Sequence, residues 1–383
     1  MFRGPGNRRR RFLNSLHAQR GELVFYSLWL GVLLFFWVSQ DGEHLLTSFL
    51  LSAYIGTIPF YLLGTYYAVP ERDGPRMALG MALVVGASCL QAIPVVWQNP
   101  GLVRLGAIEL TPETRALGIG NYAELTGFAV ALPFFLTTAL GTKHVWRILG
   151  VMSCAAIAAL SLIATLSGTI LLTTLGLIGC ALFYLFLGGI RKRRLITTAV
   201  AVVGVSVLAT MMLPQLYDIP EIGGRYQKLV NTFSDLPNIL AGRASDPTYR
   251  YELMIQSLGI FIEHPAIGVA LEARGAGTEG TGGHSSWVDA LASYGLFGGM
   301  PYLLFHLLVL RRLWRAWTVE RQNAMRWGCL LSCLLYLFYG FFNVTSQGTT
   351  VALFLFIAGV GGHKPRLRGT HGPLALRPTA AAN

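Results

Sequence analysis

Charged residues are scarce in this sequence. Lysine, arginine, aspartate and glutamate make up 13% of the 383 residues, whereas 53% of the residues are hydrophobic. Soluble globular domains carry about twice that charged fraction, so this class of protein is excluded. Repeated apolar stretches of roughly 20 residues, the length that a helix needs to cross the hydrocarbon core, predict a polytopic membrane protein instead.

Cysteine is also rare, and its occurrences all fall inside predicted membrane spans. The five residues are Cys89, Cys154, Cys180, Cys329 and Cys333. Their placement argues against a disulfide framework and against a Cys/His zinc cluster. The sequence also lacks a P-loop, a dinucleotide fingerprint and an internal repeat. We therefore expect no metal ion and no cofactor.

The apolar runs are continuous rather than alternating, which favours a helical bundle over a β-barrel. We expect an all-α polytopic membrane protein with about ten transmembrane helices, and a kink at Pro301. The expected spans are 23–39, 45–67, 77–97, 119–140, 145–166, 169–190, 195–213, 286–310, 327–344 and 349–362. The expected organisation is a basic N-terminal segment (1–22), seven spans (23–213), one long loop (214–284), three spans (285–362) and a basic tail (363–383).

The distribution of charge predicts the orientation of these spans. If the N-terminus is cytoplasmic, most of the 30 lysines and arginines fall on the cytoplasmic side, as the positive-inside rule requires. Both termini are then cytoplasmic, and the long loop lies on the outer side. The same rule explains the net charge of +12 without a nucleic-acid partner. The run Arg191-Lys192-Arg193-Arg194 is therefore interpreted as a topology signal rather than a phosphate site.

The long loop is expected to contain an amphipathic helix between Asp246-Pro247 and Pro265. Its apolar stripe has helical spacing and consists of Tyr251, Met254, Ile255, Leu258, Phe261 and Ile262. Such a helix lies along the membrane surface or covers the bundle. Arg250 falls in its first turn, where the helix dipole disfavours a cation. Arg250 is therefore a candidate for binding an anion, with a salt bridge to Glu252 or Asp246 as the alternative.

His284 lies two residues before the predicted eighth span. Ser286 and Asp289 have the spacing of a capping box at the start of that span. The positive end of the helix dipole favours a neutral imidazole at this place, so His284 is a candidate general base. The alternative is a solvated histidine with no catalytic role. Asp289 either orients the histidine or only caps the helix, and capping is the simpler interpretation.

Several of these segments resemble the O-antigen polymerase and O-antigen ligase superfamily. The resemblance rests on Arg250, on residues 261–268 (FIEHPAIG), and on His284-Ser285 followed after nine residues by Gly295-Leu296-Phe297-Gly298. The segment 115–121 (RALGIGN) and the spacing from Arg225 to Leu229 also resemble motifs of these proteins. One departure is Ser167-Gly168, where many members have Ser-Arg.

The resemblance implies a metal-independent membrane glycosyltransferase of the GT-C type in the bacterial inner membrane, with a periplasmic active site. Its donor would be a glycan on undecaprenyl diphosphate, transferred with inversion. The essential histidine would be His284. The diphosphate would be bound by Arg250 and Arg225, with Arg115 or Arg243 replacing the missing contact. A polymerase, acting on lipid-linked repeat units and with a chain-length regulator as a candidate partner, is preferred.

Three alternatives remain open. A ligase would deliver the same glycan to lipid A core. A non-enzymatic transporter of lipid-linked glycans would place charged residues inside its spans, facing a cavity, whereas Glu124 is the only clear acid within the spans predicted here. A cell-wall polymerase of the shape and division type has a similar number of spans but lacks the His284 motif.

Overall fold

The computed structural model describes only part of the chain. It covers residues 5–39, 45–68, 73–98, 103, 122–164, 167–186, 249–270, 285–343, 345 and 348–361. The predicted span 195–213, residues 214–248 and 271–284 of the long loop, and the tail 363–383 lie outside the described residues. The account of the fold is therefore confined to the described ranges.

The described residues form helices and no strands. In chain order the helices are α1 (Pro5–Ala18), α2 (Arg20–Ser39), α3 (Leu45–Ala68), α4 (Asp73–Gln98), α7 (Tyr122–Leu140), α8 (His144–Ile163), α9 (Ser167–Phe186), α13 (Tyr249–Glu263), α14 (Ser286–Val319), α15 (Ala324–Phe342) and α16 (Gly348–Gly361).

Within these ranges, seven helices are long and apolar enough to cross a membrane. They are α2, α4, α7, α8, α9, α14 and α15. Helix α3 has 24 residues and lies where a span was predicted, and α16 is a shorter apolar helix. The predicted all-α polytopic membrane protein is confirmed. The five cysteines are free and buried, and each lies in a helix as predicted.

Three helix boundaries differ from the prediction. The basic segment before the first span is itself helical, as α1. Ser167 and Gly168, expected to form a turn, are the first residues of α9. The expected loop at 311–326 is mostly helical, because α14 continues to Val319 and α15 begins at Ala324. The apolar residues Leu313 and Ala316 are buried in this continuation of α14, which explains why it persists beyond residue 310.

Helix α14 is interrupted at Gly295 rather than at Pro301. Gly295 has φ 58° and ψ −160°, the non-helical conformation recorded inside α14. The kink predicted at Pro301 is therefore wrong in position. The break divides α14 into a short segment, 286–294, and a long one, 296–319, which is hereafter the long segment of α14.

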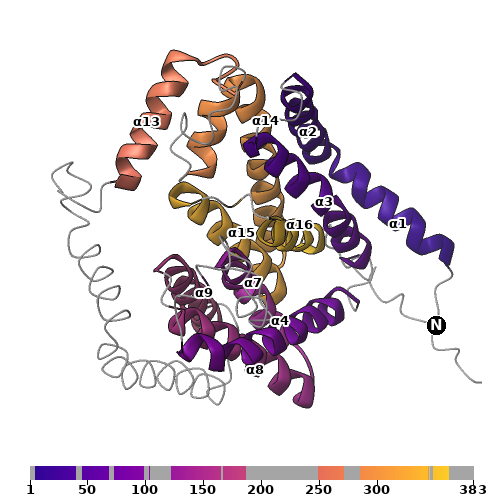
Figure 1. Cartoon of the computed structure of the whole chain (residues 1–383). Helices are drawn as coiled ribbons and strands as arrows, with labels where there is room; N and C mark the ends of the chain where they lie inside the picture. Colours follow the sequence, from indigo (N-terminus) through magenta and orange to yellow (C-terminus); the bar gives the residue numbers. More distant parts are fainter. Residues whose placement is uncertain are drawn as a thin grey trace, which may run out of the picture.

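The short helix α16 lies at the centre of the bundle (Figure 1). All of its residues from Thr350 to Gly361 are buried. It packs closely on α3, because a Cβ atom added to Gly359 would lie only 2.6 Å from the Tyr61 carbonyl oxygen of α3. Small residues allow such close approach between helices in membranes. At 14 residues, α16 is about 21 Å long, shorter than the hydrocarbon core of about 30 Å.

Helix α13 lies where the amphipathic helix was predicted, and it ends before Pro265 as expected. The predicted cap and first-turn pair, Asp246-Pro247, lies outside the described residues. Helix α13 packs against α14 at one end of the molecule (Figure 1). The orientation of its apolar stripe was not foreseen. Ile255, Leu258 and Ile262 are exposed, whereas Ser257 is fully buried. The helix therefore covers the bundle and turns part of its apolar stripe outward.

Candidate functional site

The first turn of α14 is capped by Ser285. Its backbone is extended, with φ −137° and ψ 109°, and its hydroxyl accepts a hydrogen bond from the Val288 N–H at 3.4 Å. The Asp289 carboxylate reaches back and accepts from the Ser285 N–H at 2.9 Å. This reciprocal arrangement resembles a capping box, with the acid four residues after the cap rather than three. The box was predicted one residue too late, since Ser285 and not Ser286 is the cap.

Ser286 instead joins α14 to the chain that follows α15. Its hydroxyl accepts from the Thr345 N–H at 2.7 Å and donates to the Asn343 carbonyl oxygen at 3.2 Å. The neighbouring Trp287 indole donates to the Leu337 carbonyl oxygen at 2.9 Å. Because these partners lie 50 or more residues away, only the folded bundle reveals why Ser286 is not the cap. The beginning of α14 is thereby fixed to α15.

Helix α13 contributes the other partner of Asp289. The Ser257 hydroxyl donates to the second Asp289 carboxylate oxygen at 2.7 Å. Ser257 is 0% exposed and Asp289 8% exposed. A buried carboxylate is tolerated when it accepts hydrogen bonds. Asp289 therefore caps α14 and also connects it to α13.

A second connection between the two helices is a backbone junction, which we name the glycine clasp. It consists of residues 265–270, the turn after α13, and residues 292–297, the break in α14. Four hydrogen bonds join them: Val269 N–H to Ala292 O (3.1 Å), Ala270 N–H to Ser293 O (2.9 Å), Leu296 N–H to Pro265 O (2.8 Å) and Phe297 N–H to Ala266 O (3.0 Å). Backbone groups freed by the break in α14 thus bond to the turn, as buried backbone requires.

The clasp requires glycine on both sides. Gly268 and Gly295 both have positive φ, 73° and 58°. A Cβ atom on Gly268 would lie 2.5 Å from the Ala292 carbonyl oxygen, and one on Gly295 would lie 2.5 Å from the Ile267 nitrogen. The two segments that carried the family resemblance, 265–268 and 295–298, therefore contact each other. In this structure their role is to hold α13 at the break in α14.

The structure describes only some of the predicted site residues. His284, Arg115, Arg225 and Arg243 lie outside the described residues. Arg250 is the second residue of α13, in the first turn as predicted. Of the predicted set, the structure describes Asp289 and the helix that carries Arg250. Asp289 bonds to Ser285, which follows His284 in the chain, and to Ser257 in α13.

A different histidine, His306, lies inside the long segment of α14. It is 1% exposed, and its Nδ1 atom lies 2.8 Å from the Tyr302 carbonyl oxygen. Its ring stacks against those of Tyr336 and Phe354, with centroids 5.6 and 5.2 Å away. Because aromatic rings enclose it, His306 belongs to the packing of the bundle rather than to a site open to a sugar acceptor.

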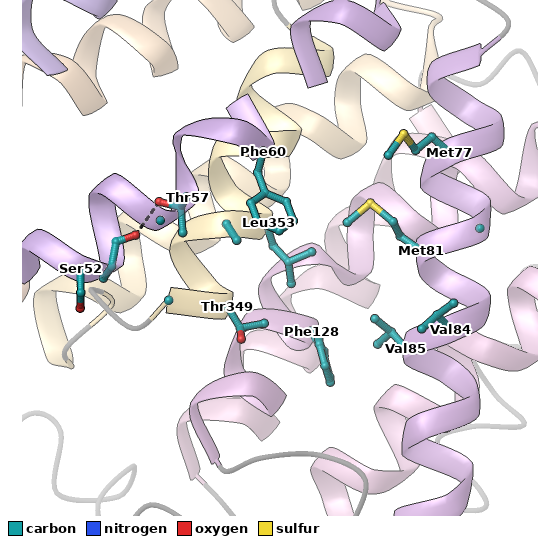
Figure 2. Close-up of a pocket in the computed structure, with 15 residues that line it drawn as sticks. Ser52, Thr57, Phe60, Met77, Met81, Val84, Val85, Phe128, Thr349 and Leu353 are labelled. Atoms are coloured by element: carbon teal, nitrogen blue, oxygen red, sulfur yellow. Dashed lines mark hydrogen bonds between the residues drawn. The ribbon is translucent and has the colours of Figure 1, made fainter. Parts of the chain in front are cut away.

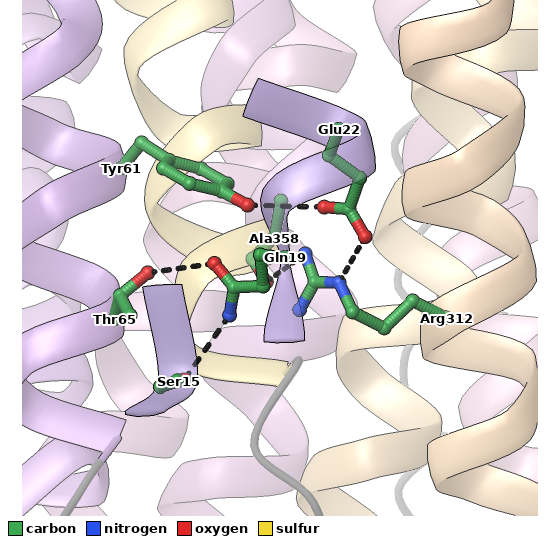
Figure 3. A network of polar contacts seen from close by, with 7 residues as sticks. All are labelled: Ser15, Gln19, Glu22, Tyr61, Thr65, Arg312 and Ala358. Atoms are coloured by element: carbon green, nitrogen blue, oxygen red, sulfur yellow. Dashed lines mark hydrogen bonds and ion pairs between the residues drawn. The ribbon is translucent and has the colours of Figure 1, made fainter. Parts of the chain in front are cut away.

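A buried ion pair was missed by the sequence analysis. Arg312 in α14 binds Glu22 in α2, with Nε 2.6 Å from the carboxylate oxygen. Figure 3 shows the surrounding network: Tyr61 donates to Glu22 at 3.0 Å, and Arg312 also donates to the Ala358 carbonyl oxygen at 3.0 Å. The expectation that Glu124 is the only clear acid in the spans is therefore wrong. Glu22 belongs to α2, which begins three residues before the predicted span.

The ion pair lies at the far end of α14 from Ser285. It joins α2, α3, α14 and α16 through side chains that are largely buried. A signal for it was present, since apolar residues continue past Leu310 with helical spacing and carry Arg312 into the span. Because these charges bond to each other, they hold helices together rather than line a pathway.

An apolar groove opens between α3, α4, α7 and α16. Its volume is about 790 Å³. Figure 2 shows the side chains of Phe60, Met81, Phe128 and Leu353 directed into it. Among the described residues that line it, none is charged. Thr349, at the beginning of α16, lines the groove four residues after Thr345, which bonds to Ser286. One end of the groove is thus four residues along the chain from a residue that contacts Ser286 at the beginning of α14.

Comparison with known families gives one match. Residues 153–303 match a family model described as O-Antigen ligase. The matched range contains Ser257, both sides of the glycine clasp and the first turn of α14, and it ends within the long segment of α14. A comparison with curated proteins finds no match. The match supports the resemblance noted in the sequence: residues 153–303 of this chain are similar to the O-antigen ligase family.

Proposed function

We propose that this protein is a glycosyltransferase that polymerises oligosaccharide repeat units carried on undecaprenyl diphosphate into O-antigen or a related surface polysaccharide. The observation that carries this proposal is the chain of hydrogen bonds from Ser257 through Asp289 to Ser285. It holds α13, with Arg250 in its first turn, against the beginning of α14, directly after His284. The candidate diphosphate ligand thus belongs to one of two connected helices, and the candidate base precedes the cap of the other in the chain.

The proposed step is a single displacement. The hydroxyl oxygen of the acceptor sugar attacks the anomeric carbon of the donor while the bond from that carbon to the diphosphate oxygen breaks. His284 takes the hydroxyl proton, and the diphosphate leaves with the bonding electron pair, so the anomeric centre inverts. A positioned base contributes about 10²- to 10⁴-fold to such a rate.

The departing diphosphate gains negative charge that must be stabilised. Arg250 is proposed to bind it together with Arg225, and Arg115 or Arg243 to supply the further contact. The guanidinium group suits this role because it binds phosphate oxygens in a bidentate manner. Preorganised positive charge at the leaving group is often the largest contribution to catalysis. These roles together need no metal ion.

The lipid tail of the donor is proposed to lie in the groove between α3, α4, α7 and α16. Support comes from its apolar lining, and from the position of Thr349 close to the residue that bonds to Ser286. The diphosphate would then remain at the beginning of α14 while the isoprenoid chain enters the bundle from the bilayer.

The same proposal places the protein in the bacterial inner membrane, with both termini cytoplasmic and the site periplasmic. This orientation rests on the positive-inside distribution of lysine and arginine. A chain-length regulator is a candidate partner. A transporter is disfavoured, because Glu22 and Arg312, two of the described charges inside the spans, bind each other, and no charged residue is among the described residues that line the groove.

An O-antigen ligase is the second candidate. It is favoured by the description of the matching family model. A ligase shares the donor and the proposed roles of His284 and Arg250 but transfers the glycan to lipid A core. The lipid-linked glycans that accumulate when the protein is absent distinguish the two activities.

The test uses a strain that lacks this protein and is complemented with wild type, His284→Ala, Arg250→Ala or His144→Ala. His144 is an exposed histidine at the first residue of α8 and serves as the matched control. Surface and lipid-linked glycans are separated on gels after equal membrane levels have been verified. We expect a normal ladder with His144→Ala and none with the other two variants.

The lipid-linked products then decide between the activities. Single repeat units on lipid indicate a polymerase, whereas long chains on lipid indicate a ligase. A normal ladder with both His284→Ala and Arg250→Ala would refute a transfer site built on these residues.

A further inference from the structure

Ser257 is the residue by which α13 is held against the beginning of α14. In α13, Ile255, Leu258 and Ile262 are 45%, 42% and 68% exposed, whereas Ser257 is 0% exposed. The side of the helix that meets α14 therefore carries a hydroxyl group. A buried hydroxyl is unfavourable unless it is hydrogen-bonded, and this one donates to Asp289 at 2.7 Å.

Asp289 also bonds to Ser285, the residue that follows the candidate base in the chain. Its other oxygen accepts from the Ser285 N–H at 2.9 Å. That N–H belongs to the peptide unit shared by residues 284 and 285. Because a peptide unit is planar, a hydrogen bond to its N–H restrains the whole unit at the beginning of α14. The Ser257 hydroxyl thus acts on the Ser285 amide through one carboxylate.

Position 250 lies on the same face of α13 as Ser257. Residues 250 and 257 are seven apart in one helix. Seven residues make almost two full turns, so the two positions share a face and are about 10 Å apart along the axis. The side of α13 that Ser257 holds against α14 therefore also carries the position of the candidate diphosphate ligand.

The glycine clasp holds α13 at its other end. The turn that follows α13 bonds to the break in α14 through backbone groups only. Loss of the Ser257 hydroxyl would leave these four hydrogen bonds in place. Helix α13 would stay attached at its C-terminal end and become free to change its angle to the beginning of α14.

From these contacts we infer that Ser257 is a positioning residue for glycosyl transfer, holding the first turn of α14 against α13, the helix that carries Arg250, through Asp289. The inference rests on the proposed function. Ser257 touches neither substrate nor reacting atoms in this role. Its loss should therefore lower the turnover number while the clasp and the bundle persist.

The experiment compares wild type with Ser257→Ala, Ser257→Thr and Ser161→Ala, purified as full chains in lipid nanodiscs. Threonine retains the hydroxyl. Ser161 is the matched control because it is also fully buried, but its hydroxyl bonds to Ile157 within its own helix. Two quantities are measured: deuterium uptake of peptides covering 285–289 and 295–297, and kcat and KM with a lipid-diphosphate-linked repeat unit.

With Ser257→Ala we expect faster deuterium uptake at 285–289, unchanged uptake at 295–297, and a kcat lower by about tenfold to a hundredfold, the scale of one lost hydrogen bond to a charged group. Ser257→Thr should restore most of both quantities, and Ser161→Ala should change neither. Unchanged uptake at 285–289, an unchanged kcat, or failure of threonine to rescue would each overturn the inference.

Failure of the proposed function would look different. In that case His284→Ala would retain full activity, whereas deuterium uptake would still report whether Ser257 restrains the amide of Ser285. The exchange measurement requires no assumption about the reaction.

Discussion

Opening the glycine clasp by Gly295→Ala should destabilise the protein strongly. Gly295 has φ 58° and ψ −160°, a region occupied essentially by glycine alone, and another residue there costs about 1–3 kcal/mol. The added Cβ would also meet backbone atoms of Ala266 and Ile267 at 2.5 Å or less, where no side chain can rotate away. The turn after α13 would therefore have to move.

That movement breaks two hydrogen bonds, from Leu296 N–H to Pro265 O and from Phe297 N–H to Ala266 O. Each contributes about 0.5–1.5 kcal/mol. Together with the backbone strain, the expected loss is about 2–6 kcal/mol. A typical protein has a free energy of unfolding of about 5–15 kcal/mol, so this is a large fraction of the total.

The assay is reversible unfolding in mixed micelles, titrated with sodium dodecyl sulfate. Gly259→Ala is the control, because Gly259 is in α13 and an added Cβ meets nothing within 4 Å. It should be neutral or stabilise by up to about 1 kcal/mol. Gly268→Ala should resemble Gly295→Ala, and the double variant should lose less than the sum, because the two glycines contact the same junction. A Gly295→Ala variant within about 0.5 kcal/mol of wild type would refute the clasp.

Two further predictions concern the ion pair and the groove. Arg312→Gln should destabilise the protein by about 3–5 kcal/mol in the same assay, because it leaves Glu22 buried without its cation. Adding Glu22→Gln should recover much of this loss, and a double variant less stable than Arg312→Gln would contradict the prediction. In the groove, Gly80→Leu should raise KM for the lipid-linked donor by about 5- to 30-fold, the effect of roughly ten lost atomic contacts. Gly31→Leu is its control, since both glycines have nothing within 4 Å of an added Cβ and only Gly80 lines the groove; equal KM values would argue against a lipid tail there.

The sequence by itself determined where most of the apolar helices lie. Continuous apolar runs must hydrogen-bond their own backbone in a membrane, so their positions follow from composition and length alone. The end of α13 was also predictable, because Pro265 acts locally on the chain. The segments 265–268 and 295–298 could be related to a family from the sequence, and the match over residues 153–303 supports this.

Only the tertiary structure decided how these segments are used. The break in α14 falls at Gly295 and not at Pro301, because the freed backbone groups need the turn at Gly268 as their partner. The cap is Ser285 and not Ser286, because the Ser286 hydroxyl bonds to Thr345.

The ion pair between Glu22 and Arg312 joins residues 290 positions apart, and Ser257 bonds to Asp289 across 32 positions. Helical periodicity describes neighbours within a few turns along the chain, and it carries no record of which distant helix a face will meet. The sequence therefore determined where most of the apolar helices lie, and it carried the family resemblance. Packing between distant segments decided where α14 breaks, which serine caps it, and which side chains hold the candidate site together.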